Sequence, residues 1–192
     1  MFSFLKRKIR PEAGTAGLEG GGGPYQTFLG GAYRQHASAD RDRYTALAVE
    51  AFPDFGGRID CFGIDWLGNQ FATDLARVVG GRPQILLLEP GTGEVLELPA
   101  TMDTFHDGLL VQEPDAVAAH EFFKRWLAAG GAVPAYGECV GYRKPLYLGG
   151  ADDIANLEII DLEVYWSISA QLLAKLRGLP AGTSVGRVTL DD

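Results

Sequence analysis

Histidine and cysteine are the residue types in this chain best suited to metal binding, acid–base catalysis or thiol chemistry. The chain has three histidines, His36, His106 and His120, and two cysteines, Cys61 and Cys139. Recognisable metal motifs place two histidines four residues apart on a helix or two cysteines in a Cys-x-x-Cys turn. Neither spacing occurs in this sequence. We therefore expect no metal site, and we predict a protein without a cofactor.

A small metal-dependent hydrolase is the alternative interpretation. It would use His106, Asp107 and His120 together with nearby carboxylates. His106 and Asp107 are neighbours in sequence, however, and neighbouring residues on a helix face different directions. The absence of clustered ligands therefore favours a binding protein over this enzyme.

The two cysteines indicate neither thiol catalysis nor a disulfide framework. Cys61 lies in an apolar run, where a cysteine usually behaves as a small buried hydrophobic residue. Cys139 follows Glu138, whose negative charge disfavours the thiolate. Two cysteines in 192 residues are typical of a protein from a reducing cytoplasm.

Charge is distributed unevenly along the sequence. The formal net charge is −8, and residues 83–123 contain acidic side chains but no lysine or arginine. Such a stretch repels nucleic acid and attracts a partner protein with a basic surface. The alternative is an ordinary acidic surface that aids solubility. The candidate contact residues are Glu89, Glu94, Glu97, Asp103, Asp107, Glu113 and Asp115.

The N-terminal residues differ in composition from the rest of the chain. Residues 12–24 are rich in glycine and lack periodicity, so we predict a flexible tail over 1–23 and one folded domain over 24–192. In residues 1–10 the apolar side chains precede the basic ones, which is the reverse of a secretory signal. No apolar run reaches the roughly 18 residues of a membrane-spanning helix. We therefore predict a cytoplasmic protein without stable membrane insertion.

Hydrophobic patterning predicts an α+β domain with a central, mainly antiparallel sheet flanked by helices. Apolar runs on either side of Leu67-Gly68-Asn69 and of the turn at residues 90–93 predict two hairpins. Within residues 84–89, the residues between Gln84 and Glu89 are continuously apolar, so this strand should be covered on both faces. Helices are expected over residues 38–52, 101–110, 114–129 and 161–177.

Two of these elements carry specific expectations. The helix over 114–129 should be continuous, with a buried stripe formed by Ala119, Phe122, Phe123, Trp126 and Leu127. The segment from Gly141 to Trp166 should contain two strands around a Gly149-Gly150 turn, followed by a helix that Asp161 caps.

This last segment resembles the C-terminal domain of bacterial immunity proteins that protect against type VI secretion DNase effectors. That family is similar to the SUKH superfamily of toxin-neutralising domains, and the similarity extends from about Ile59 to Val185. The resemblance implies a SUKH-like fold and a role as a toxin inhibitor. The matching motif residues are Gly141, Pro145, Gly149, Gly150, Asn156, Asp161, Tyr165 and Trp166.

The resemblance implies that the acidic stretch contributes to binding the toxin. A nuclease toxin must present a basic surface to DNA, and an acidic protein can cover that surface. Long-range attraction would speed the encounter. The helical spacing of Tyr165 and Trp166 favours core packing over a place in the interface. The second alternative is an intracellular adaptor of the same fold.

Overall fold

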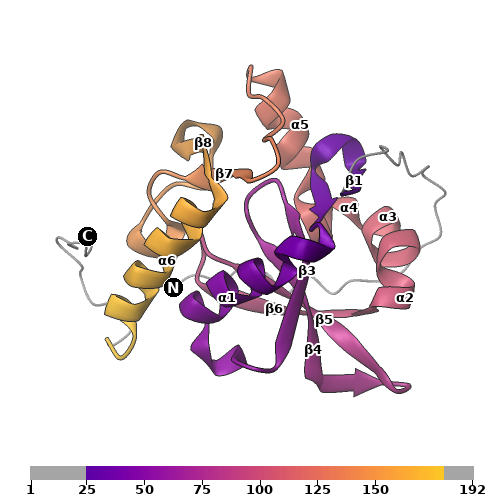
Figure 1. Ribbon diagram of the computed structural model, residues 1–192. Helices are drawn as coiled ribbons and strands as arrows, with labels where there is room; N and C mark the ends of the chain where they lie inside the picture. The colour runs from indigo at the N-terminus through magenta and orange to yellow at the C-terminus, as the bar shows by residue number, and fades with distance from the viewer. Residues whose placement is uncertain (1–24, 180–192) are drawn as a thin grey trace.

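The computed structural model describes residues 25–179 and shows an α+β fold (Figure 1). Six strands form an antiparallel sheet in the order β1-β2-β3-β4-β5-β6, and β7 pairs with β8 in a second, two-stranded sheet. This confirms the predicted fold class. The strands are β1 Thr27–Phe28, β2 Tyr33–Gln35, β3 Ile59–Asp65, β4 Gln70–Val79, β5 Arg82–Glu89, β6 Glu94–Thr101, β7 Glu138–Tyr142 and β8 Leu157–Asp161.

The helices lie on both faces of the larger sheet. The α-helices are α1 Arg41–Ala51, α2 Met102–Thr104, α3 Leu110–Gln112, α4 Pro114–Ala118, α5 His120–Ala128 and α6 Leu162–Leu176. A π-helix, η4 Phe105–Leu109, joins α2 to α3. Short 3₁₀ turns are η1 Leu29–Gly31, η2 Ser38–Asp40, η3 Pro53–Phe55, η5 Leu146–Leu148 and η6 Ile154–Asn156.

Both predicted hairpins are confirmed. β3 pairs with β4 around the Leu67-Gly68-Asn69 turn, where Gly68 has a φ of 84° that favours glycine. β5 pairs with β6 around residues 90–93, and Gly93 has a φ of 71°. The strand predicted to be covered on both faces is also confirmed, because Leu86 and Leu88 contact one core cluster while Ile85 and Leu87 contact another.

The core therefore has two layers, one on each face of the sheet. α1 and α6 lie side by side and cover one face, where Tyr44 and Trp166 are buried against the strands (Figure 1). The segment from α2 to α4 covers the other face, where Phe71 and Phe105 are buried. A third cluster around Trp66 joins α5 and the β7–β8 sheet to the end of the main sheet.

The prediction of one continuous helix over residues 114–129 was wrong. The helix breaks at Ala119, which has a left-handed backbone with φ 45° and ψ 44°. Asp115 stabilises the break, since its carbonyl accepts from the Ala119 N–H at 3.1 Å and its carboxylate accepts from the Glu121 N–H at 3.1 Å. The change in direction places Phe122 and Phe123 against the Trp66 ring, at centroid distances of 5.3 Å.

The predicted buried stripe of that helix is only partly correct. Phe122 and Phe123 are buried, and Ala119 and Trp126 are half-buried. Leu127 is exposed. The expected helix over 101–110 is likewise divided into α2, the π-helix and the start of α3.

The motif residues in the segment from Gly141 to Trp166 have structural roles. A Cβ atom on Gly141 would lie 2.8 Å from the Tyr165 ring, and one on Gly150 would lie 1.9 Å from the Lys144 carbonyl oxygen. Asn156 accepts from the Lys144 N–H at 3.0 Å and donates to the Lys144 carbonyl at 2.8 Å, which closes the loop before β8.

The helix cap and the packing predicted for this segment are confirmed. The Asp161 carboxylate accepts from the Val164 N–H at 3.0 Å at the start of α6. Tyr165 and Trp166 are buried in the core, and the Trp166 indole donates to the Gly68 carbonyl at 2.9 Å. The predicted strand around residues 139–148 is shorter than expected, because Leu146–Leu148 form a 3₁₀ turn. The predicted flexible tail lies outside the described residues.

Candidate interaction surface

The seven candidate acidic residues do not form one continuous face. Glu94 and Glu97 lie on β6, the edge strand of the sheet. Asp103 and Asp107 line an open groove of about 540 Å³ formed by the end of β6 and the turns that follow it. Glu89 and Asp115 line a separate pocket, and Glu113 precedes α4.

Arginines from just outside the acidic stretch neutralise part of it. The Arg77 guanidinium lies 3.4 Å from the Glu97 carboxylate, and Arg82 lies 3.2 Å from Asp103. Lys124, one residue beyond the stretch, pairs with Glu121 at 2.8 Å. The two arginine pairs depend on the packing of the sheet, because Arg77 on β4 pairs with β6 and Arg82 on β5 pairs with α2, whereas Lys124 and Glu121 are three residues apart on α5. Glu94 forms no ion pair with any residue among 25–179.

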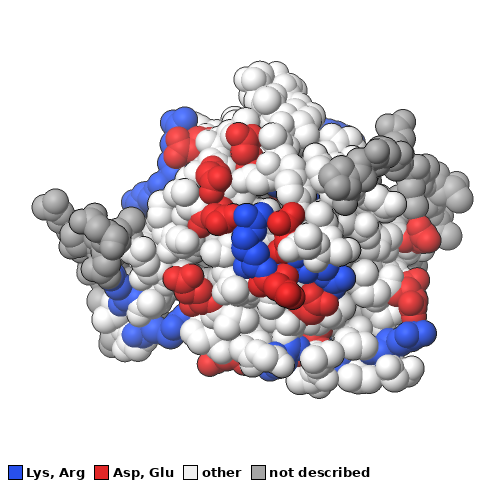
Figure 2. All heavy atoms as spheres, viewed as in Figure 1, with Lys and Arg blue, Asp and Glu red and all other residues white. Residues whose placement is uncertain are grey.

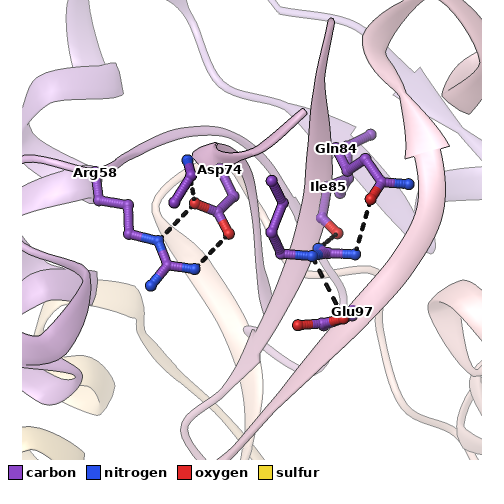
Figure 3. A network of polar contacts seen from close by, with 7 residues as sticks. Arg58, Asp74, Gln84, Ile85 and Glu97 are labelled. Atoms are coloured by element: carbon purple, nitrogen blue, oxygen red, sulfur yellow. Dashed lines mark hydrogen bonds and ion pairs between the residues drawn. The ribbon is translucent and has the colours of Figure 1, made fainter. Parts of the chain in front are cut away.

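Three contacts hold Arg77 beside β5, and Figure 3 labels its partners Gln84, Ile85 and Glu97. Its guanidinium donates to the Ile85 carbonyl at 3.1 Å and to the Gln84 side chain at 3.3 Å, in addition to its contact with Glu97. Beside it, Arg58 donates twice to the Asp74 carboxylate, at 2.6 and 2.7 Å. These two hydrogen bonds hold the pKa of Asp74 below its usual value. The network contains two arginines and two carboxylates, so its formal charges balance.

The face covered by α1 and α6 is also of mixed charge. Figure 2 shows acidic and basic side chains next to one another there. Arg43 of α1 pairs with Asp40 and with Glu163 of α6, and Arg41 pairs with Asp60. Although the net charge of the chain is −8, the acidic side chains of this face are partly balanced by arginines.

The pocket that contains Glu89 and Asp115 brings four carboxylates together. Asp65 and Asp152 complete the set, and the cavity measures about 170 Å³. The apolar part of its lining includes Leu87, Val117 and Phe122. Sequence reasoning missed Asp65, which lies in an apolar run, and it did not place Asp152 in a site. The only sequence signal for Asp65 is an acidic residue at the end of a buried strand.

The carboxylates of the pocket are individually hydrogen-bonded. Asp65 is buried and accepts from the Asn69 N–H at 2.9 Å and the Asn69 amide at 2.8 Å. Burial nevertheless raises the pKa of Asp65 to about 7. Glu89 accepts from the Thr92 hydroxyl at 2.8 Å, and burial raises its pKa too. Asp152 accepts from the Tyr142 hydroxyl at 2.7 Å.

The histidines of the alternative hydrolase interpretation have separate surroundings. The His106 Nε2 contacts the Tyr33 hydroxyl at 3.0 Å and the Gln35 amide at 2.9 Å, and burial lowers the His106 pKa. His120 begins α5, and burial lowers its pKa as well. Within residues 25–179 no three His, Cys, Asp or Glu side chains are placed to hold a metal ion.

The cysteines are buried, free thiols. Burial raises the pKa of Cys61 to about 12, and it raises that of Cys139 further. Both thiols are therefore protonated at neutral pH and shielded from reagents.

The comparison with protein families gives a match in the C-terminal half of the chain. Residues 100–173 match the family model described as T6SS immunity protein Tdi1, C-terminal. The predicted resemblance to type VI immunity proteins is confirmed for this segment. The immunity segment, residues 100–173, includes all eight motif residues named from the sequence, but only Asp103, Asp107, Glu113 and Asp115 of the seven candidate acids.

The crystal structure of Atu4351 from Agrobacterium tumefaciens is similar to this chain in fold. The TM-score is 0.51 at 14% sequence identity, and the match covers 77% of this chain and 70% of that chain. It extends the likeness in fold beyond the immunity segment. No curated protein sequence matches the chain. None of the helices in the described part of the chain is both long and apolar enough to cross a membrane.

Proposed function

We propose that this protein is a cytoplasmic immunity factor that binds a co-encoded type VI toxin and blocks it by occlusion, without catalysis. The family match over residues 100–173 carries this proposal. The immunity segment supplies the helices that cover one face of the sheet and the β7–β8 sheet, so it is an integral part of the fold.

The negative charge of the protein favours a partner toxin that has a basic surface, such as a nuclease. The net charge is −8, and Glu94 is an exposed acidic side chain without an ion pair among the described residues. A protein of this charge attracts a basic partner over long range. Apolar or aromatic side chains near the centre of the contact would then set the rate of dissociation.

The test is binding and growth rescue with the product of the gene next to this one. We expect a one-to-one complex by titration calorimetry and survival of cells that express both proteins. An unrelated acidic protein of similar charge serves as the control, because nonspecific attraction would let it bind as well. If the wild-type protein neither binds nor rescues growth, the immunity proposal is wrong, and metal content and hydrolase activity become the next measurements.

A further inference from the structure

The strand β6 forms an open edge of the main sheet. It pairs with β5 on one side, and no described residue outside β5 forms a backbone hydrogen bond with residues 95–100. At the end of the strand, the Thr101 N–H donates to the Thr104 hydroxyl at 3.1 Å.

The position of Pro99 shows which backbone groups face the open side. Proline lacks an N–H group, and within sheets it occurs where that group would face away from a neighbouring strand. Backbone groups alternate in direction along an antiparallel strand. Val95 and Glu97 therefore turn their N–H and C=O groups to the same open edge as Pro99, whereas Leu96 and Leu98 turn theirs to β5.

The edge is regular over a length that can pair with another strand. Residues 94–98 pair with residues 85–89 in unbroken register, and the irregularity begins only after Leu98. The opposite edge of the sheet is β1, which has two residues. Edge strands are commonly protected by charged side chains, by proline, by bulges or by short length. In β6 the proline and the register shift come only after Leu98, and the regular part over residues 94–98 has no lysine, arginine or proline and is charged only through its glutamates.

The side chains of this edge indicate the chemistry of a partner strand. Glu94 and Glu97 are exposed, and of these two glutamates Glu97 forms an ion pair with Arg77, at 3.4 Å. Between them Leu96 is 40% exposed and offers an apolar contact. A second copy would bring the same two glutamates to the edge and be repelled. A strand with lysine or arginine and an apolar residue would complement the edge in charge and in hydrogen bonding.

We propose that the toxin adds an extended, basic segment to β6, so that backbone hydrogen bonds extend the main sheet by one strand. This inference rests on the proposed function and specifies its contact. It assigns the recognition of charge to Glu94 and Glu97 and the hydrogen bonds to the backbone of Val95 and Glu97.

Amide hydrogen exchange resolved by residue tests the proposal on the full chain. In the free protein the Val95 and Glu97 amides should exchange rapidly, while those of Leu96 and Leu98 exchange slowly. Addition of the co-encoded toxin should slow Val95 and Glu97 by about tenfold or more. A complex that forms and rescues growth but leaves these two amides fast would overturn the edge inference and leave the immunity function intact.

Two further outcomes would also overturn it. Amides of Val95 and Glu97 that are already slow in the free protein would mean that a segment of this chain covers the edge. If their protection disappears on dilution, a second copy covers it. Absence of any complex with the wild-type protein would overturn both the edge inference and the proposed function.

A pair of variants separates the backbone contact from the charge. Glu97→Pro removes the outward N–H as well as the charge, and Glu97→Gln removes only the charge. Proline is tolerated on an edge strand, so both variants should keep the β5 pairing. We expect Glu97→Pro to bind the toxin roughly tenfold more weakly than Glu97→Gln, as the loss of about one hydrogen bond predicts. Equal affinities for the two folded variants would contradict strand addition.

Discussion

At the scale of single residues, the carboxyl of Asp65 is a fully buried titratable group with a raised pKa. It has two hydrogen bonds from Asn69, yet burial raises its pKa to about 7. Nearby Glu89 acts in the same direction, because a second negative charge disfavours ionisation. The folded protein therefore binds a proton at Asp65 more tightly than the unfolded chain does.

This shift predicts a specific pH dependence of stability. A raised folded-state pKa contributes stability below the unfolded value of 3.8, and that contribution is lost as the pH rises toward about 7. His36 acts in the opposite direction, since burial lowers its pKa to about 4, so its contribution grows as the pH rises from about 4 to 6.5. The wild-type profile sums these two effects with those of the other groups whose pKa values shift on folding.

The variant Asp65→Asn isolates the Asp65 contribution, because both proteins retain His36. We expect the free energy of unfolding of the variant, relative to that of the wild type, to increase by about 1–3 kcal/mol between pH 5 and pH 8. Urea denaturation of both proteins at several pH values measures this difference. Parallel profiles would show that Asp65 has an ordinary pKa in the folded state.

At the scale of elements, the break between α4 and α5 determines where the aromatic side chains of α5 lie. Apolar spacing across residues 114–129 is compatible with one helix, and that was the prediction. The left-handed Ala119 interrupts it, and Phe122 and Phe123 pack against Trp66 as a result. Periodicity could not reveal the break, because apolar spacing carries no information on the left-handed backbone of Ala119 or on the hydrogen bonds of Asp115 that accompany it.

Glycine substitutions at Ala119 and at the preceding Ala118 test the break. A left-handed backbone costs an L-residue about 1–2 kcal/mol, and glycine avoids this cost but adds about 0.4–1 kcal/mol of unfolded-state entropy. We therefore expect Ala119→Gly to raise the free energy of unfolding by about 0.5 kcal/mol. Ala118→Gly is the matched control and should lower it by about 1 kcal/mol. Thermal or urea denaturation measures both, and equal losses would indicate a continuous helix.

At the scale of the whole molecule, folding divides the acidic stretch into places with different surroundings. Glu97 and Asp103 are paired with arginines, and Glu89 lies in a pocket lined by other carboxylates. Glu94 remains exposed on the open edge. Long-range attraction to a basic toxin should therefore depend more on Glu94 than on acidic residues elsewhere.

Charge reversal at Glu94 tests this steering effect. Glu94→Lys should slow association with the co-encoded toxin by roughly two- to fivefold at low salt and reduce the dependence of the rate on ionic strength. Glu50→Lys, an equal change of charge at an exposed position of α1, is the matched control and should have a smaller effect. Stopped-flow measurements at several salt concentrations provide the rates. If both variants slow association equally, only the net charge matters.

Much of the architecture is determined by local sequence. Gly68 and Gly93 allow the two hairpin turns, continuous apolar residues around Leu87 require cover on both faces of β5, and Asp161 caps α6. These features depend on backbone conformation and on hydrophobic periodicity, which short segments carry by themselves. The resemblance of the immunity segment likewise rests on residues that shape its turns and core.

The candidate surface, by contrast, depends on contacts between distant segments. Tertiary structure pairs Arg77 with Glu97, brings Asp65 and Asp152 to the pocket of Glu89, and leaves β6 as the edge of the sheet. Sequence composition gives the number of charges but not their positions in space. Whether a strand lies at the edge of a sheet depends on which strands pair with it. The physical reason is that ion pairing, burial and open hydrogen-bonding groups are properties of packed elements, not of the segments from which they form.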